Sequence, residues 1–378
     1  MEYKKLGDIA TYINGYAFKP EDRGDEGLPI IRIQDLTGNS YDLGFYDGEY
    51  PEKIEINDGD VLISWSASLG VYVWNRGKAL LNQHIFKVAF DKLDIDKNYF
   101  VYAVRRKLDE MTSKTHGATM KHIVKKDFDA TQIPYPSLEE QAEIASNLDR
   151  VSRIIEVRKA ELEKLDELIK ARFVEMFGDP ATNPMKWEET SVGQECYYIK
   201  DGPHKSLPDI GKENGGHPFI SVRNIVNRVI DFTTARYISD EDYAEARKKC
   251  CPEKGDILYS KGGTTGIAKL IDVETEFANW VHLAVLKFDK DKLNGVFFEN
   301  MLNCDYCYDQ SQRLTKGIAN RDLVLSAMAQ IKMYRPPKIL QDQFAAFVKQ
   351  VDKSKAVIQK SLDETQVLFD SLMQKYFG

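Results

Sequence analysis

The sequence contains one long internal repeat, and this repeat constrains the fold more than any other feature. Residues 115–128 (THGATMKHIVKKDF) match residues 315–328 (TKGIANRDLVLSAM) at an offset of 200. Other residues keep this offset: Pro136 and Pro336, Gln141 and Gln341, and Phe177-Gly178 and Phe377-Gly378. The register of the repeat therefore holds without a gap over the second part of each copy.

The repeat continues upstream with a smaller offset, as insertions in loops would produce. Residues 56–70 (INDGDVLISWSASLG) match residues 252–266 (PEKGDILYSKGGTTG). Residues 28–36 (LPIIRIQDL) match residues 217–225 (HPFISVRNI). Because the order of the matched segments never changes, we interpret the chain as a two-fold tandem repeat of roughly 190 residues per copy.

Each copy predicts a β-rich globular part followed by one long helix. Short apolar runs broken by Gly, Asp and Asn predict strands in LPIIRI, DVLISW, VYVW and HIFKVAF. The segment 97–111 predicts a shorter helix. We expect an α+β fold of two mixed α/β domains joined by two long antiparallel helices. The predicted boundaries are 1–135 and 179–335 for the domains, and 136–178 and 336–378 for the helices.

The two long helices carry apolar residues at alternating spacings of four and three, which is the pattern of a coiled coil. In the first helix these residues are Ile144, Leu148, Val151, Ile155, Leu162, Leu165 and Ile169. In the second they are Phe344, Val348, Val351, Ile358, Leu362, Phe369 and Leu372. The pattern is interrupted by Arg158, Arg172, Lys355 and Thr365.

A coiled-coil pattern requires a long partner helix, and three partners fit it. The two helices can pack against each other within one chain, antiparallel, with the two globular domains a rod length apart. They can also pair with other proteins, or with a second copy of the chain. About 38 residues at 1.5 Å each give a rod of about 57 Å. We favour pairing within the chain, because it buries both patterns without another molecule.

Composition limits the function classes. The net charge of −7 argues against a simple cationic nucleic-acid binder, although local patches matter more than the total. No apolar run approaches the ~20 residues of a membrane span, and the first residues lack an apolar signal region. Five cysteines, an odd number, predict reduced thiols. We expect a cytoplasmic protein without membrane contact.

Motifs of catalysis are incomplete. The segment GGTTGIAK at 262–269 lacks the Gly-Lys-Ser/Thr of a phosphate-binding loop. The segment TNPMKW at 182–187 has Met185 where an amino-methyltransferase motif has its second proline. Zinc binding by Cys250, Cys251 and the CDYC segment at 304–307 is disfavoured, because adjacent cysteines suit one tetrahedral ion poorly. We predict neither catalytic residues nor a metal site.

Candidate DNA-contacting residues occur at equivalent places in both copies. The stretch 105–126 holds seven Lys/Arg against two acidic residues. From the two basic zones we select Lys114, His116, Lys121 and His122, and Arg313, Lys316, Asn320 and Arg321. From the polar ends of predicted strands we select Ser64, Trp65, Ser66, Asn82, Gln83 and His84 in the first copy. In the second copy we select Arg223, Asn224, Ser260, Lys261, Thr264, Thr265, Trp280 and His282.

These side chains are of the types that read base edges, since Asn and Gln pair with adenine, and Arg and Lys with guanine. Equivalent loops with different side chains suit two domains of one fold that read two different short sequences. The alternative interpretations are a solvated charged face and ordinary drift of loops after duplication.

The chain resembles the specificity subunit of type I restriction-modification systems over essentially its whole length. The resemblance rests on IPYPSLEEQAEIASNLD at 133–149, YRPPKILQDQFAAFVKQVD at 334–352 and FVEMFGDPATNPMKW at 173–187. GDVLISWSASLG and LNQHIFKV resemble loops of the first unit. The second copy departs from the family pattern with PKILQDQ in place of PSLEEQ, which leaves the start of its helix open.

This resemblance implies two target recognition domains that each read one half of a split, asymmetric double-stranded DNA site. The paired helices would set the gap and dock two methyltransferase subunits, which would bring S-adenosylmethionine. Motor-nuclease subunits would add cleavage. The subunit itself would hold no cofactor and no active site. Two alternatives remain: a two-headed protein-interaction scaffold, and an enzyme with an unrecognised site.

Overall fold

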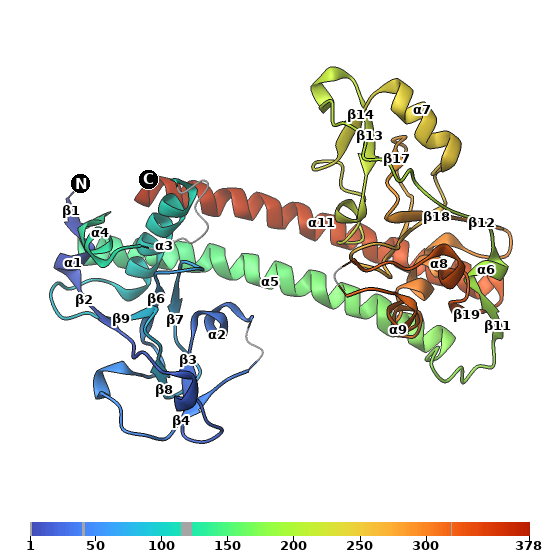
Figure 1. The fold of residues 1–378 in the computed structure, drawn as a ribbon. Coiled ribbons are helices and arrows are strands. Elements are labelled where there is room, and N and C mark those ends of the chain that lie inside the picture. The colour runs from blue at the N-terminus through green and yellow to red at the C-terminus, as the bar shows by residue number, and fades with distance from the viewer. Residues whose placement is uncertain (1, 40–41, 115–122, 319) are drawn as a thin grey trace. The chain divides into compact units, whose positions relative to one another are not determined.

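The computed structural model describes residues 2–39, 42–114, 123–318 and 320–378, and the chain divides into two compact units (Figure 1). Unit 1 comprises residues 1–159 and 360–378, and unit 2 comprises residues 160–359. Each unit contains one β-rich domain and one half of each of the two long helices. This agrees with the predicted α+β class.

The domain of unit 1 is built on an antiparallel four-stranded sheet with the strand order β2-β9-β6-β7. Its strands are β2 (Thr11–Asn14), β9 (Ile85–Ala89), β6 (Val61–Ser64) and β7 (Gly70–Val73). The last three fall in the segments HIFKVAF, DVLISW and VYVW, so these strand predictions are confirmed. Strand β6 is buried along its whole length because the sheet is covered on both faces.

A second sheet of unit 1 has the order β4-β3-β8-β5, in which β3 and β8 are parallel. Its strands are β4 (Phe45–Tyr46), β3 (Leu28–Ile31), β8 (Ala79–Leu81) and β5 (Glu55–Ile56). A two-stranded ladder joins the ends of the domain, β1 (Tyr3–Lys5) and β10 (Gln132–Pro134). The helices are α1 (Leu6–Ile9), α2 (Ile33–Thr37), α3 (Lys97–Lys114) and α4 (Lys125–Ala130), with 3-10 turns at Pro20–Asp22 and Glu52–Ile54.

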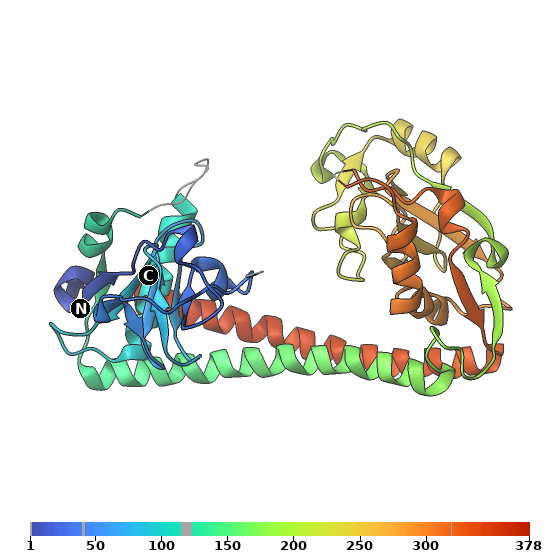
Figure 2. The same ribbon diagram turned by 60° about the horizontal axis from the view of Figure 1, so that its bottom comes forward.

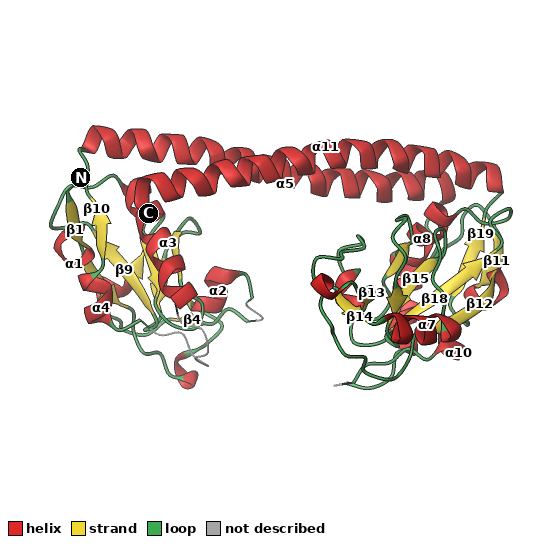
Figure 3. Cartoon of the chain, turned by 90° about the horizontal axis from the view of Figure 1, so that it is seen from above, coloured by secondary structure: helices red, strands yellow, loops and turns green. Residues whose placement is uncertain are grey.

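Unit 2 repeats this topology. The four-stranded sheet is β12 (Cys196–Asp201), β18 (Leu283–Phe288), β15 (Ile257–Ser260) and β16 (Ala268–Leu270) (Figure 3). The second sheet is β14 (Arg236–Ile238), β13 (His217–Ile220) and β17 (Ala278–Asn279), and the ladder is β11 (Glu188–Ser191) with β19 (Lys332–Arg335). Its helices are α6 (Val192–Glu195), α7 (Asp240–Lys249), α8 (Gly295–Leu302), α9 (Asp305–Leu314) and α10 (Leu325–Met328), with 3-10 turns at Lys212–Asn214 and Val222–Asn224.

The repeated Gly-Asp pair explains one turn that the two units share. Gly59 and Gly255 precede β6 and β15 with φ of +89° and +88°, a region that glycine enters without a steric cost. The carboxylate of Asp60 accepts a hydrogen bond from the Asn57 amide, and that of Asp256 accepts one from the Glu253 amide. The two residues together therefore close the same tight turn in each unit.

The two long helices are α5 (Leu138–Phe177) and α11 (Lys338–Phe377), each of 40 residues. A capping box starts α5, because Glu140 N–H donates to the Ser137 hydroxyl and the Glu140 carboxylate accepts from the Ser137 amide. The second helix starts at the equivalent position, directly after Pro336 and Pro337. The change from PSLEEQ to PKILQDQ therefore leaves the helix start in place.

In each unit, half of α5 packs antiparallel against half of α11, and the strands of that unit lie on one side of the pair (Figure 2). In unit 2 the ring of Phe344 lies 5.5 Å from Phe173 and 5.6 Å from Phe177. Further along the same pair, Lys355 binds Asp166 at 2.7 Å. In unit 1 Leu148 shares a core with α11 residues of its last turns. No helix in the described part of the chain is long and apolar enough to cross a membrane.

Candidate nucleic-acid interface

Three predicted segments of unit 2 meet at one edge of its four-stranded sheet. The Lys261 amide donates to the His282 carbonyl at 2.8 Å. The Leu323 amide donates to the Lys261 carbonyl at 2.7 Å, and the Gly263 amide donates to the Arg321 carbonyl at 3.0 Å. The loops at 260–265, 280–282 and 315–323 are therefore neighbours in space although they lie far apart in sequence.

Several of the candidate residues at this edge hold the loops together. Ser260 is fully buried and its hydroxyl accepts from the Ile267 amide at 2.8 Å. The Lys261 ammonium is 2.8 Å from Asp322, and the Thr265 hydroxyl lies 3.0 Å from that of Thr315. Asn224, 1 % exposed, accepts from the Ser221 amide and donates to the Asp231 carbonyl. In this structure these side chains face the interior and hold the surface loops in place.

The remaining candidates of unit 2 are accessible. Trp280 and His282 are half-buried, with ring centroids 4.5 Å apart. The other accessible residues are exposed: Arg223, Thr264, Arg313, Lys316, Asn320 and Arg321. Together they form a polar, mainly cationic surface around the buried positioning residues.

The corresponding edge of unit 1 is built around Trp65. Its ring stacks on Phe86 at 5.7 Å and lies 5.5 Å from the ring of His84. His84 is exposed, whereas Ser66, Asn82 and Gln83 are half-buried. Ser64 is fully buried, and its hydroxyl donates to the Ser68 carbonyl at 2.5 Å. The two edges thus share a frame but present different side chains.

Part of the first basic zone lies outside the described residues. This applies to His116, Lys121 and His122, and to the side chain of Lys114. The residue that follows, Ile123, donates its amide to the Trp65 carbonyl at 2.9 Å. This bond is the counterpart of that between Leu323 and Lys261, so the segment returns to the same edge in both units.

The predicted coiled-coil residues differ in depth. The buried ones are Leu148, Ile155, Ile169, Phe344, Val348, Val351 and Leu362, and the half-buried ones are Ile144, Val151, Leu162, Leu165, Ile358, Phe369 and Leu372. Sequence reasoning missed the deeply buried Ala145, Phe173, Met373 and Phe377, which pack against the β-rich domains. These helices therefore bury a wider face than a two-stranded coiled coil needs.

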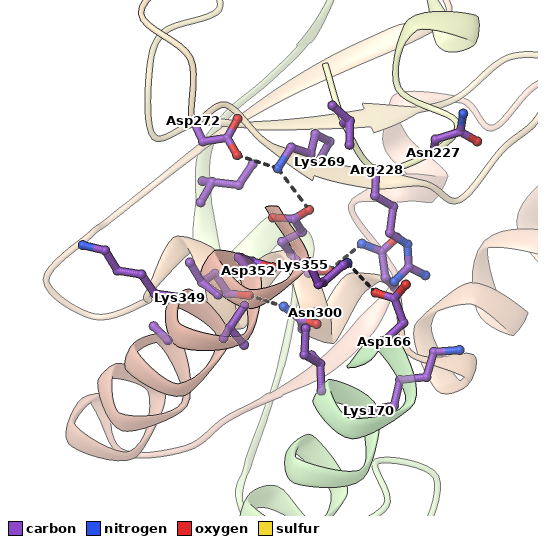
Figure 4. Close-up of a pocket in the computed structure, with 18 of the residues that line it drawn as sticks. Asp166, Lys170, Asn227, Arg228, Lys269, Asp272, Asn300, Lys349, Asp352 and Lys355 are labelled. Atoms are coloured by element: carbon purple, nitrogen blue, oxygen red, sulfur yellow. Dashed lines mark hydrogen bonds and ion pairs between the residues drawn. The ribbon is translucent and has the colours of Figure 1, made fainter. Parts of the chain in front are cut away.

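Sequence reasoning also missed a cavity of about 730 Å³ in unit 2, between β16, α8 and both long helices (Figure 4). Its polar wall centres on Lys269, whose ammonium lies 2.8 Å from Asp272 and 3.7 Å from Glu299. Burial raises the pKa of Glu299 to about 7, even though Lys269 opposes this shift. Burial alone would lower the pKa of Lys269, but Glu299 and Asp272 outweigh it and raise that pKa.

A metal site is not assembled from the residues that the structure describes. Among them, no group of three or more His, Cys, Asp or Glu side chains could hold a metal ion. Cys250 and Cys307 belong to separate hydrophobic clusters. Desolvation raises the pKa of Cys250 to about 11, so this thiol stays protonated at neutral pH.

These features define a tandem-repeat protein with two β-rich recognition-type domains, each mounted on paired helix halves. The chain belongs to the family of the type I restriction modification DNA specificity domain, whose sequence profile matches residues 1–167 and 184–365. The predicted identity as a specificity subunit, the non-catalytic part of a type I complex, is thereby confirmed. The family carries no cofactor of its own.

Similar proteins include the EcoBI specificity subunit of Escherichia coli, 30% identical over 69% of this chain and 60% of that protein's length. The MjaVIII specificity subunit of Methanocaldococcus jannaschii is 21% identical over 97% of this chain and 89% of its own length. The crystal structure of the S subunit from M. genitalium has a similar fold, with a TM-score of 0.58, 17% identity and coverage of 100% and 96% of the two chains.

Proposed function

We propose that each β-rich domain reads one half of a bipartite, asymmetric DNA site, and that the long helices set the gap between the halves. The observation that carries this proposal is the pair of equivalent edges with different side chains. The edge of unit 1 exposes His84 with half-buried Ser66 and Gln83, whereas the edge of unit 2 exposes Thr264, Lys316 and Arg321. Two copies of one frame with unlike surfaces suit two unlike sequences.

The partners belong to the same proposal. Two methyltransferase subunits dock on the two long helices and bring S-adenosylmethionine, and motor-nuclease subunits complete the restriction complex. The complex acts on double-stranded DNA in the cytoplasm. The exposed apolar side chains of α5 and α11, Val157 and Val357 among them, support a second protein on the outer face of the helices.

Each domain is suited to replacement as a unit, because its two ends are tied together. In unit 2, β11 pairs with β19 from Glu188 to Ser191, and Arg335 binds Glu188 and Glu195 across this ladder. Residues 179–335 can therefore be exchanged for the second domain of another specificity subunit without cutting through a sheet.

The exchange tests the proposal. Cells that express the methyltransferase with the exchanged subunit should methylate a site in which one half-site is new and the other is unchanged. Genome-wide methylation sequencing measures both. The matched experiment exchanges residues 1–135 and should change the opposite half-site. A change in both half-sites, or an unchanged site, contradicts the modular reading; loss of DNA association with protein binding intact would favour the interaction scaffold.

A further inference from the structure

The strands β13 and β17 of unit 2 are parallel neighbours (Figure 1). A small cavity lies at their carboxyl ends. It measures about 170 Å³ and is lined by Phe219, Ser221, Arg223, Arg236 and Trp280. The Trp280 amide donates to the Ile220 carbonyl at 2.9 Å, which joins the two strand ends. Phe219 is 4 % exposed and forms an apolar floor.

The polar atoms of this cavity are almost all hydrogen-bond donors. The Trp280 indole N–H is buried and has no partner among the described residues. Arg223 donates one N–H to the Thr234 carbonyl at 2.7 Å, and the other N–H groups of its guanidinium remain available to a ligand. Arg236 is exposed, and its side chain forms no hydrogen bond or ion pair with the part of the chain that the structure describes. The Ser221 hydroxyl is already bound to Asn224.

The carboxylate of Asp209 lies near both arginines but is engaged elsewhere. It accepts hydrogen bonds from the amides of Tyr237 at 3.0 Å and Gly211 at 3.1 Å. These bonds, and next to them the arginine charges, lower its pKa, so it stays ionised at neutral pH. A fixed negative charge here disfavours a phosphate and leaves the neutral edge of a base as the better ligand.

A donor-lined cavity selects among the four bases. In the major groove guanine presents two acceptors, N7 and O6, whereas adenine and cytosine present an amino donor and thymine presents a methyl group beside its acceptor. We propose that this cavity reads a guanine of the second half-site, with Arg236 and Arg223 donating to its N7 and O6. The Trp280 side chain forms the wall of the cavity beside these two guanidinium groups.

At the equivalent strands of unit 1 the arginines are paired with carboxylates, Arg23 with Asp42 and Arg32 with Asp35, which confines the proposal to unit 2. The sheet registers place Gly44 where unit 2 has Arg236, and Asn82 where it has Trp280. Asn82 carries an amide that both donates and accepts. The guanine preference is therefore a property of one half-site, and this inference rests on the proposed function of the domains.

The test uses the complex of the full chain with its methyltransferase subunits and a duplex that carries the site found by methylation sequencing. Each guanine of the second half-site is replaced in turn by 7-deazaguanine, which pairs normally but lacks the N7 acceptor. We expect one replacement to weaken binding on the order of tenfold. In Arg236→Ala and Arg223→Ala this penalty should fall toward onefold at that guanine and at no other base.

Two further variants separate base reading from charge. Arg236→Lys keeps the charge but loses the planar fork, so it should bind non-specific DNA normally and lose the discrimination. Lys248→Ala removes an exposed cation of α7 in the same unit and should leave the 7-deazaguanine penalty unchanged. If Arg236→Ala or Arg223→Ala weakens binding equally for all DNA sequences, and the slope of log affinity against log salt concentration falls by about one, the arginine contacts a phosphate and the inference is overturned.

The inference is also overturned if the second half-site contains no guanine, or if all variants keep the full penalty. These outcomes differ from a failure of the proposed function. If the proposed function is wrong, the exchange of residues 179–335 leaves the half-site unchanged. If only the guanine contact is wrong, the exchange still changes the half-site.

Discussion

At the scale of single residues, the clearest product of the repeat is a pair of buried glutamines. Gln141 and Gln341 are both 0 % exposed at the first turn of a long helix. The Gln341 side chain accepts from the Asn294 amide at 2.8 Å and donates to the Pro336 carbonyl at 2.7 Å. Gln141 makes the same two bonds with Asp96 and Pro136. Each amide therefore links a helix start to its β-rich domain.

Gln341→Leu should lower the free energy of unfolding of unit 2 by about 1–3 kcal/mol, because a backbone N–H and a backbone C=O lose their partners inside the protein. Chemical denaturation measures the change, and hydrogen exchange of the Asn294 amide should accelerate. Gln350→Leu, at an exposed position of the same helix, is the control and should stay within about 0.5 kcal/mol. Equal effects of the two substitutions would contradict the role of Gln341.

Glu299 predicts a pH dependence of stability. Its folded pKa of about 7 lies above the ordinary value of 4.5, so between these values the folded chain holds a proton that the unfolded chain has lost. This contribution to stability is fully present below about pH 4.5, falls as the pH rises toward 7, and is absent above it. The wild type should lose on the order of 1–3 kcal/mol of unfolding free energy from this group over this pH window, and Glu299→Gln should not show this loss.

Denaturation of wild type and Glu299→Gln at pH 5 and pH 8 measures this effect as a difference of differences, so that other titrating groups cancel. The wild type should lose more stability than the variant between these two pH values. The same loss in both proteins would show that Glu299 is ionised throughout, and that the ion pair with Lys269 outweighs burial.

At the scale of elements, the long helices are amphipathic in a way that the four-three spacing describes only in part. Phe344 is fully buried among the rings of Phe173, Phe177 and Phe297. Its ring contacts Phe173 and Phe177 of the partner helix, and these two rings contact Phe297 of the β-rich domain.

Phe344→Ala should destabilise unit 2 by about 3–5 kcal/mol, because it removes a ring from a closely packed cluster and leaves a cavity. Val357→Ala, on the same helix at 72 % exposure, should change stability by less than about 0.5 kcal/mol. Thermal and denaturant unfolding of the two variants provides the measurement. A loss below 1 kcal/mol for Phe344→Ala would mean that the helix end is not packed as described.

At the scale of the whole molecule, helix length is the quantity that the proposed function uses. Insertion of one heptad after Lys159 and another after Gln359 lengthens both helices by about 10 Å at 1.5 Å per residue. The gap in the methylated site should then increase by about three base pairs at 3.4 Å each, with both half-sites unchanged. Methylation sequencing reads gap and half-sites together; an unaltered gap would rule out a spacing role for the helices.

The sequence predicted the long helices well, because their apolar periodicity extends over many residues. It did not predict which polar side chains are buried. The repeat and the four-three spacing located α5 and α11, because a pattern sustained over 40 residues has few competing explanations. Ser260 and Ser64 look like polar loop residues in the sequence. In the structure both are fully buried and bind backbone groups, an outcome that depends on which strand end folds over them.

By itself, the sequence determined the tandem repeat, the helix–domain order, the fold class and the family, since all of these rest on order and spacing along one chain. Only the tertiary structure decided which polar residues hold the loops and which remain accessible, and it alone revealed the donor-lined cavity of Arg223, Arg236 and Trp280. The reason is that burial and hydrogen-bond partners arise from segments distant in sequence, whose meeting no local pattern records.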